Sequence, residues 1–276
     1  MPDSMPANLL LLGGTGEAAA LARRLHEAMP ELALTSSLAG RTRDPLLPPG
    51  EIRIGGFGGI DGLVAYLQQQ QVTLLVNATH PYATAMSAHA LAAQQRSGIP
   101  LLRLLRPAWR KQTADTWIMA AHAKGAAAIC RWLGKRILLA LGSQEIAAFA
   151  GSPRAHFFVR MVDAPEAPLP LDKYEVIAAR GPFALADERR LLLEHNIDLV
   201  VAKNSGGEAS FAKIAAAREL GVPVVMIERP EASLRPGCDS VATVDEAFAW
   251  IAERCDDQTA RSLRTGESSA ATGDKA

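Results

Sequence analysis

Leu9-Leu10-Leu11-Leu12-Gly13-Gly14-Thr15-Gly16-Glu17-Ala18-Ala19 is the stretch that decides the fold. The leucines predict a buried strand, and the glycines predict a tight turn into a helix from about Thr15 to Ala28. The free N–H groups and the positive dipole end at such a helix start suit a pyrophosphate. The spacing is G-x-x-G-x-x-A rather than G-x-G-x-x-G, so a tight turn without a ligand stays open as the alternative.

The composition is that of an ordinary globular protein. The chain has 276 residues, 49% of them apolar and 21% charged, which is long enough for two domains. Lys plus Arg and Asp plus Glu both number 29, so a net charge of zero argues against general attraction to nucleic acid or a membrane surface. No basic leader and no apolar stretch of about 18 residues is visible. We therefore expect a cytoplasmic protein without a signal peptide or membrane span.

The cysteines and histidines give no sign of a disulfide framework or a metal site. The three cysteines, at 130, 238 and 255, are far apart and form no C-x-x-C pair. The six histidines form no H-x-x-x-H or H-E-x-x-H arrangement. We expect reduced thiols and no metal.

Short apolar runs alternate with helical stretches along most of the chain. In the first half the pattern predicts strands at 9–12, 32–38, 52–54, 73–78 and 100–105, with helices at 15–28, 61–70 and 83–97. In the second half it predicts strands at 136–141, 154–162, 175–179, 198–202 and 223–227, with helices at 144–150, 184–196, 209–220 and 244–253. This alternation predicts an α/β fold of two Rossmann-like, doubly wound domains, with mostly parallel sheets and a cleft between them. We expect an N-terminal domain at 1–110, a second domain at 111–255 and a disordered tail at 256–276.

The second predicted strand indicates which dinucleotide the turn would bind. An NAD site places Asp or Glu at the end of this strand, but Thr35–Ala39 contains no acid. Arg41, with the hydroxyls of Ser37 and Thr42, could hold a 2′-phosphate by charge-assisted hydrogen bonds. The pattern therefore favours NADPH over NADH, with a solvated basic loop as the alternative.

Two further loops are expected at the same edge of the sheet. Gly55 and Gly56 begin a run of four glycines in five residues, which predicts either close approach to the dinucleotide or a mobile loop. Asn77-Ala78-Thr79-His80-Pro81-Tyr82-Ala83 follows the fourth strand, at the edge where ligands bind in open α/β sheets. The predicted cofactor-binding residues are Gly13, Gly14, Thr15, Gly16, Glu17, Ser37, Arg41, Thr42, Gly55, Gly56, Asn77, Thr79, His80 and Pro81.

Three predicted strands of the second half end in polar and glycine residues, at 140–145, 179–183 and 201–207. Each puts small polar side chains and backbone N–H groups at the carboxyl edge of a sheet. Together they could line one wall of a cleft that faces the cofactor, although each alone is equally typical of a helix cap or turn.

The motifs occur in a recognisable order. They are Gly-Gly-Thr-Gly-Glu-Ala at 13–18, Asn-Ala-Thr-His-Pro-Tyr-Ala at 77–83, Arg106-Pro107 with Trp109, Gly-Ser-Gln-Glu at 142–145 and Lys-Asn-Ser-Gly-Gly at 203–207. In this combination the chain closely resembles the precorrin-6A reductase family of cobalamin biosynthesis, which includes cobalt-precorrin-6A reductases, over residues 8–254. The resemblance implies an NADPH-dependent reduction of one double bond of the precorrin-6A (or cobalt-precorrin-6A) macrocycle, giving precorrin-6B.

The implied substrate is an anionic tetrapyrrole that carries many carboxylates. Its expected contacts are Arg106, Ser143, Gln144, Glu145, Arg160, Arg180, Lys203, Asn204, Ser205, Gly206 and Gly207, because arginine forks and backbone N–H groups suit carboxylates. His80, Tyr82 and Lys203 are the candidate proton donors, with His80 first because its ordinary pKa is near neutrality. Transient contacts with neighbouring enzymes of the pathway are compatible with this role.

Two other function classes remain as alternatives. An NADP-binding sensor would share the glycine turn and Arg41 but would not need the polar strand ends of the second half. A nucleotide-sugar enzyme with paired Rossmann-like domains would share the architecture. The short-chain epimerase variant needs Tyr-x-x-x-Lys, and Tyr66, Tyr82 and Tyr174 are followed four residues later by Gln, Met and Ala.

Overall fold

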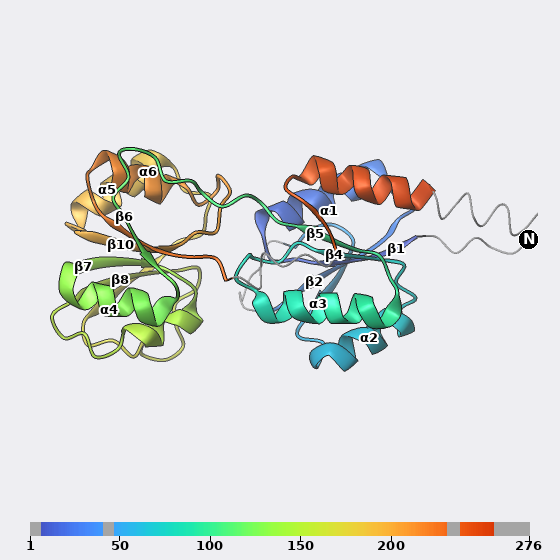
Figure 1. The fold of residues 1–276 in the computed structure, drawn as a ribbon, viewed down its shortest axis with the longest axis horizontal. Helices are drawn as coiled ribbons and strands as arrows, with labels where there is room; N and C mark the ends of the chain where they lie inside the picture. Colours follow the sequence, from blue (N-terminus) through green and yellow to red (C-terminus); the bar gives the residue numbers. More distant parts are fainter. Residues whose placement is uncertain (1–6, 41–46, 231–237, 257–276) are drawn as a thin grey trace, which may run out of the picture. The chain divides into compact units, whose positions relative to one another are not determined.

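The structure, a computed structural model, describes residues 7–40, 47–230 and 238–256 (Figure 1). It consists of two compact units. The first contains the described residues up to Arg106 and those from 238 onward, and the second contains 107–230. Each unit has a six-stranded parallel sheet with helices, so the α/β class predicted from the sequence is confirmed. None of the helices within these described ranges is long and apolar enough to cross a membrane.

The sheet of the first unit has the strand order β12-β5-β4-β1-β2-β3, and all its neighbours pair in parallel. The strands are β1 (Asn8–Leu12), β2 (Ala33–Leu38), β3 (Glu51–Ile54), β4 (Leu74–Asn77), β5 (Leu101–Leu104) and β12 (Asp239–Val241). All four leucines of β1 are buried, as a central strand covered on both faces requires. The chain winds outward through β2 and β3, then crosses to β4 on the other side of β1. The carboxyl edge between β1 and β4 is therefore the switch point at which such sheets bind ligands.

Helices cover both faces of this sheet. They are α1 (Gly16–Ala28), α2 (Gly59–Gln69), α3 (Thr84–Ser97) and a helix at 244–256. Leu21 and Leu25 of α1 pack with Ile251 against one face, whereas Leu63 of α2 and Ala90 of α3 pack against the other. Because these buried positions recur at helical spacing, the helices of the first half could be predicted from the sequence.

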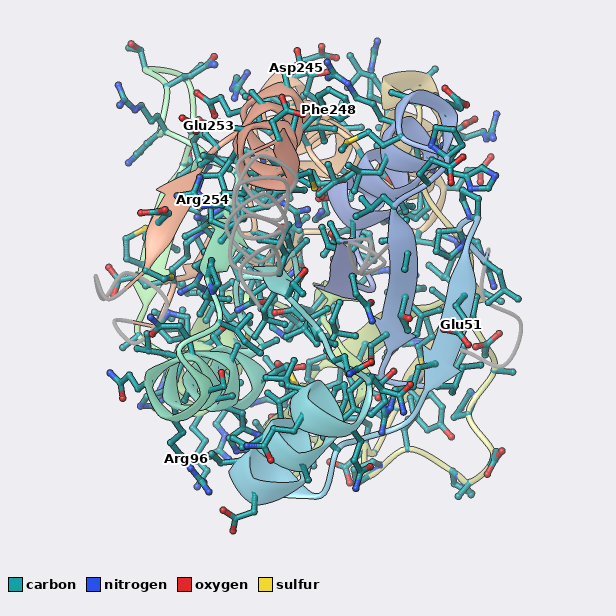
Figure 2. All side chains as sticks on the ribbon, turned by 90° about the vertical axis from the view of Figure 1, so that its right-hand side faces the viewer. Glu51, Arg96, Asp245, Phe248, Glu253 and Arg254 are labelled. Atoms are coloured by element: carbon teal, nitrogen blue, oxygen red, sulfur yellow. The ribbon has the colours of Figure 1, made fainter. Side chains whose placement is uncertain are left out.

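The last described segment, 238–256, belongs to the first unit. Its strand β12 pairs in parallel with β5, and its helix lies beside α1 (Figure 1). Arg24 of α1 forms an ion pair with Asp245 and stacks on the ring of Phe248, two residues labelled in Figure 2. The sequence-based division placed 111–255 in one domain, because the three-residue strand Asp239–Val241 carries no periodic signal. Residue 256 is helical, and the rest of the expected tail lies outside the described residues.

The second unit repeats the winding of β1 to β5 in its strands β7 to β11, but its edge strand β6 comes before them in the chain, whereas β12 comes last. Its sheet has the order β6-β11-β10-β7-β8-β9, again with parallel neighbours throughout. The strands are β6 (Trp117–Ala120), β7 (Arg136–Ala140), β8 (His156–Met161), β9 (Tyr174–Ala178), β10 (Leu199–Lys203) and β11 (Val224–Ile227). The helices are α4 (Ala123–Leu133), the 3₁₀-helix η1 (Ser143–Phe149), α5 (Leu185–Glu194) and α6 (Ala212–Glu219). Its switch point lies between β7 and β10.

The sequence analysis missed β6 and α4, which precede the first strand predicted for the second half. The strand has only four residues, and α4 buries Ala126, Ala127 and Cys130 rather than large side chains. These buried residues recur at helical spacing, so the sequence does carry a signal for this helix, although the residues on its buried face are small. Burial raises the pKa of the Cys130 thiol to about 12, so this cysteine is an inert core residue.

Candidate active site

The glycine turn of the first unit is built at the carboxyl end of β1. The Thr15 side chain caps α1 by accepting a hydrogen bond from the N–H of Ala18 at 3.1 Å, and its hydroxyl donates to the carbonyl of Ala78 at 2.8 Å. Gly14 has φ +100°, a conformation that favours glycine, and a Cβ added at Gly14 or Gly16 would meet nothing within 4 Å. The turn is therefore held firmly from within and open on its outer side.

The loop after β4 is fixed by the buried amide of Asn77. The Asn77 Oδ1 accepts hydrogen bonds from the N–H and hydroxyl of Thr79, at 3.2 and 2.7 Å, and its Nδ2 donates to Ser87 of α3 at 3.1 Å. Asn77 therefore shapes the loop from beneath. His80 and Tyr82 are half-buried, with ring centroids 5.6 Å apart, and the N–H of Tyr82 donates to Nδ1 of His80 at 3.3 Å.

The glycine loop after β3 is anchored by an arginine that the sequence analysis did not single out. The guanidinium of Arg53 donates to the carbonyls of Gly55 and Gly56, at 2.7 and 2.8 Å, and lies 3.8 Å from the Phe57 ring centroid. The N–H of Gly55 also donates to the carbonyl of Leu38 at the end of β2, at 2.9 Å. These hydrogen bonds fix the position of the loop next to the end of β2. An arginine in a strand just before a glycine run was the signal that could have found it.

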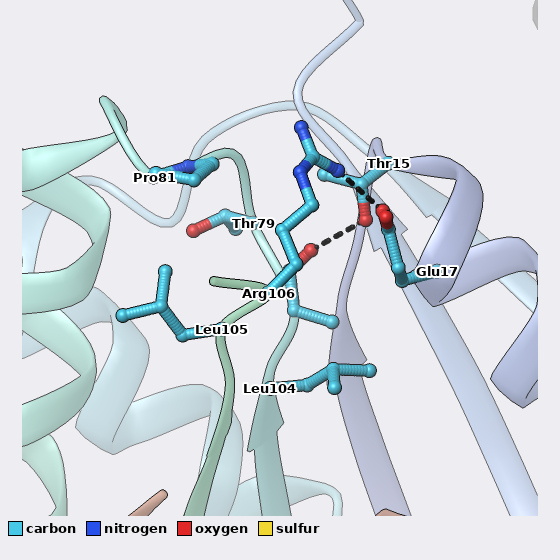
Figure 3. A pocket seen from close by; sticks show the side chains of 8 residues that line it. Thr15, Glu17, Thr79, Pro81, Leu104, Leu105 and Arg106 are labelled. Atoms are coloured by element: carbon cyan, nitrogen blue, oxygen red, sulfur yellow. Dashed lines mark hydrogen bonds and ion pairs between the residues drawn. The ribbon is translucent and has the colours of Figure 1, made fainter. Parts of the chain in front are cut away.

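The glycine turn, the loop after β4 and the residues that end and follow β5 meet at a small hollow beside the switch point. It is lined by Thr15, Glu17, Ala78, Thr79, Pro81, Leu104, Leu105 and Arg106, and it has room for about one water molecule. Figure 3 shows Arg106 reaching toward Thr15 and Glu17, with Pro81 on its other side. The Arg106 guanidinium forms an ion pair with the Glu17 carboxylate, and their side chains are 15% and 27% exposed. Arg106 was expected among the substrate contacts, but it lies beside the glycine turn and pairs with Glu17.

Of the three residues expected to select NADPH, the structure describes one, Ser37. Ser37 is buried in β2, and its carbonyl accepts the N–H of Gly13 at 2.9 Å, which ties the turn to the second strand. Arg41 and Thr42 lie outside the described residues.

Two motifs of the second unit meet at its own switch point. Lys203, the last residue of β10, forms an ion pair with Glu145 of η1, and these side chains are 15% and 27% exposed. Gly142 lies beneath this pair, and a Cβ added there would lie 2.9 Å from a carboxylate oxygen of Glu145, so the end of the Glu145 side chain would have to shift. Ser143 and Gln144 are exposed at the start of η1. The structure therefore brings Gly-Ser-Gln-Glu and Lys-Asn-Ser-Gly-Gly together.

The loop after Lys203 is clamped to the segment that begins the second unit. The Asn204 side chain accepts from the N–H of Trp109 at 2.8 Å and donates to the Trp109 carbonyl at 3.1 Å, while the indole N–H donates to Gly207 at 2.9 Å. Arg229 donates to the carbonyls of Asn204 and Ser205, both at 2.8 Å. The Ser205 N–H donates to the Lys203 carbonyl at 2.7 Å. These internal bonds fix the shape of the loop that follows Lys203.

Arg160 lies in the interior of the second unit. Its two terminal nitrogens bind both carboxylate oxygens of Glu188, at 2.7 and 2.9 Å, and the side chains are 6% and 2% exposed. The guanidinium also lies 4.4 Å from the Phe183 ring centroid. The structure therefore gives Arg160 a structural role in place of the expected substrate contact. Arg180, by contrast, is exposed beside the end of β9.

Comparison with known proteins decides the family. The family model described as Precorrin-6x reductase CbiJ/CobK matches residues 8–252. The chain belongs to the precorrin-6x reductase family. The resemblance stated from the five motifs is thereby confirmed, and the protein is an oxidoreductase of cobalamin biosynthesis that acts on a tetrapyrrole macrocycle.

Relatives and a solved structure cover nearly the whole precorrin-6x reductase chain. A precorrin-6A reductase of Rhodococcus erythropolis is 46% identical over 243 residues, which is 88% of this chain and 96% of the relative. A cobalt-precorrin-6A reductase of Salmonella typhimurium is 29% identical over 233 residues, 81% of this chain and 88% of the relative. The solved structure described as CobK precorrin-6A reductase has a TM-score of 0.82 at 40% identity, covering 90% of this chain and 96% of that one.

Among the described residues of this reductase, no group of three or more His, Cys, Asp or Glu side chains could hold a metal ion. The charged groups at the two switch points are instead ion pairs, Glu17–Arg106 and Glu145–Lys203.

Gly206 of this reductase should tolerate no side chain. Its φ is +68°, and an added Cβ would lie 1.9 Å from the Pro107 carbonyl oxygen. The left-handed conformation alone costs about 1–2 kcal/mol with a Cβ, and the clash adds to it. Gly151 is a matched control, because it also has φ +68° but nothing lies within 4 Å. In urea unfolding, Gly206→Ala should lose clearly more stability than Gly151→Ala; equal losses would contradict the clamp described here.

The Arg160–Glu188 pair gives a second test. Glu188→Gln leaves a buried guanidinium without its counter-charge and should lower the free energy of unfolding by about 3 kcal/mol or more. The double variant Arg160→Met with Glu188→Met removes both charges and should recover most of this loss. A double variant that is stable but has at least a tenfold higher KM for the tetrapyrrole would return Arg160 to the substrate site.

Proposed function

We propose that this protein reduces precorrin-6A with NADPH, with the cofactor held by the first unit and carboxylates of the macrocycle held by the second. The observation that carries the proposal is the glycine turn at the switch point between β1 and β4. Its outer side is open at Gly14 and Gly16, and its helix start presents backbone N–H groups, which fits a dinucleotide diphosphate. The family match supplies the reaction class.

On the cofactor side the protein positions loops rather than supplying chemistry. NADPH, when bound, supplies the hydride for the reduction. Thr15 fixes the start of α1 against Ala78, Asn77 fixes Thr79, and Arg53 holds the Gly55–Gly56 loop. Arg41, Thr42 and Ser37 remain the proposed contacts to the 2′-phosphate. Loops that are already fixed favour cofactor binding, because they need no further ordering when the ligand arrives.

On the substrate side we assign carboxylate recognition to the exposed Arg180 and the half-buried Lys203. Lys203 ends β10 and Arg180 follows β9, and all strands of this sheet are parallel, so both residues lie at its carboxyl edge. A guanidinium and an ammonium suit the acetate and propionate groups of a tetrapyrrole. Glu145 balances the charge of Lys203 in the absence of ligand. Ser143, Gln144 and the backbone of Gly206 and Gly207 are the proposed neutral contacts.

His80 is the proposed proton donor. Its Nδ1 accepts the N–H of Tyr82 in the neutral ring, so Nε2 is the nitrogen proposed to face a ligand. Delivery of a proton requires the imidazolium form, in which Nδ1 is protonated as well and this hydrogen bond is given up. Tyr82 and Lys203 remain the alternatives for this role.

The metal-free substrate is favoured over the cobalt form. The precorrin-6A reductase of R. erythropolis is 46% identical to this chain, whereas the cobalt-precorrin-6A reductase of S. typhimurium is 29% identical. The cytoplasmic location and transient contacts with neighbouring enzymes stay predictions from the sequence.

The direct test is an anaerobic absorbance assay with precorrin-6A or cobalt-precorrin-6A as substrate and NADPH or NADH as cofactor. We expect NADPH oxidation matched by a change in the tetrapyrrole spectrum, fastest with precorrin-6A and NADPH. Equal rates with NADH would contradict the role of Arg41. NADPH binding without turnover of either substrate would favour a sensor over a reductase.

Gly14→Ala tests the cofactor site itself. A Cβ at φ +100° strains the turn and occupies its open side, so NADPH affinity should fall about tenfold or more in a fluorescence titration. Gly98→Ala is the matched control, since Gly98 has φ +72° at the end of α3 and nothing within 4 Å. The control should lose stability but keep its NADPH affinity. A Gly14→Ala variant with unchanged affinity would place the dinucleotide elsewhere.

A further inference from the structure

The ion pair of Glu17 and Arg106 lies where the diphosphate of a dinucleotide would approach. Glu17 is in the first turn of α1, two residues after the capping Thr15, and Arg106 follows β5 on the other side of the hollow. Figure 3 shows the two charged groups meeting beside Thr15. Both side chains are mostly but not fully buried, so each is partly shielded from water and still within reach of a ligand.

A carboxylate at this position has two opposite electrostatic effects. It stabilises the start of α1, because a negative charge favours the positive end of the helix dipole. It also repels any anion that approaches the same N–H groups, and partial burial strengthens that repulsion by reducing screening. A diphosphate can occupy the helix start only if the charge of Glu17 is compensated. Arg106 forms an ion pair with that carboxylate.

We propose that Arg106 is a cofactor-affinity residue that acts by neutralising Glu17, rather than a receptor for a substrate carboxylate. This inference rests on the proposed binding of NADPH at the glycine turn. Arg106 lines the hollow together with Thr15, Thr79 and Pro81, three residues of the proposed cofactor site. Arg106 is the positively charged residue among those that line the hollow, and its ion pair with Glu17 keeps the guanidinium beside the start of α1. The affinity for NADPH therefore depends on the two residues jointly and not on Arg106 alone.

A double-mutant cycle on NADPH affinity tests this coupling. Arg106→Ala leaves the Glu17 carboxylate bare and should weaken NADPH binding about tenfold or more in a fluorescence titration. Glu17→Gln should bind NADPH at least as tightly as the parent protein. The double variant lacks both charges and should bind within about fivefold of the parent, because the repulsion is gone. Arg106→Lys keeps the positive charge and should restore most of the affinity.

The matched controls are Arg24→Ala and Asp245→Asn. They break another ion pair of α1, on the part of the helix remote from the glycine turn, and should change NADPH affinity less than about twofold. Thermal unfolding of every variant separates a loss of affinity from a loss of fold.

Two results would overturn the inference. A double variant as weak as Arg106→Ala would show that Arg106 does not act through Glu17. An Arg106→Ala variant with unchanged NADPH affinity and a raised KM for the tetrapyrrole would make it a substrate receptor. Failure of the parent protein to bind NADPH is distinguishable from both, and would remove the proposed function together with this inference.

Discussion

Parallel pairing on both sides of a central strand is the constraint on which the site depends. In the first unit β1 pairs with β2 on one side and β4 on the other, and in the second β7 pairs with β8 and β10. Because all these strands run in one direction, their carboxyl ends reach one edge, and the helices that follow diverge to opposite faces. The glycine turn, the Asn77 loop and the ion pairs all occupy that divergence. At this edge polar groups stay out of the core around the sheets, which is filled mainly by leucine, valine and phenylalanine side chains.

The two units share the order of five of their six strands, but they carry different groups at the carboxyl edge of the sheet. In the first, a long helix begins at the edge with an open glycine turn and a capping threonine. In the second, the corresponding element is the short η1, and the edge is filled by Glu145 and Lys203 over Gly142. A helix start with open N–H groups suits a diphosphate, whereas a lysine at a strand end suits a carboxylate. The architecture is repeated, and the chemistry is set by the few residues at each switch point.

The sequence predicted most of the sheet strands and the glycine turn because both depend on local patterns: apolar runs for the strands and closely spaced glycines for the turn. Leu9–Leu12 and Leu199–Ala202 could be read directly, since buried parallel strands are continuous apolar runs. The patterns missed β12 and α4, where pairing or small-residue packing decides the structure. They also could not tell a ligand-facing arginine from one that is paired inside the protein. Arg160 is paired with Glu188, which is 28 residues away in sequence, so this partner is set by the tertiary fold. The partners of Arg53 are carbonyls of its own loop, two and three residues away, so a local signal existed there.

The return of the chain to its first sheet has a consequence for the order of assembly. The second unit is one continuous segment, 107–230, placed between two pieces of the first. During synthesis it can be complete while the first sheet still lacks β12 and the helix at 244–256 that packs beside α1. The half of the protein that begins first is therefore the half that finishes last. Until then β5 is an edge strand with one side unpaired, which makes the nascent first unit the part that most needs protection from association.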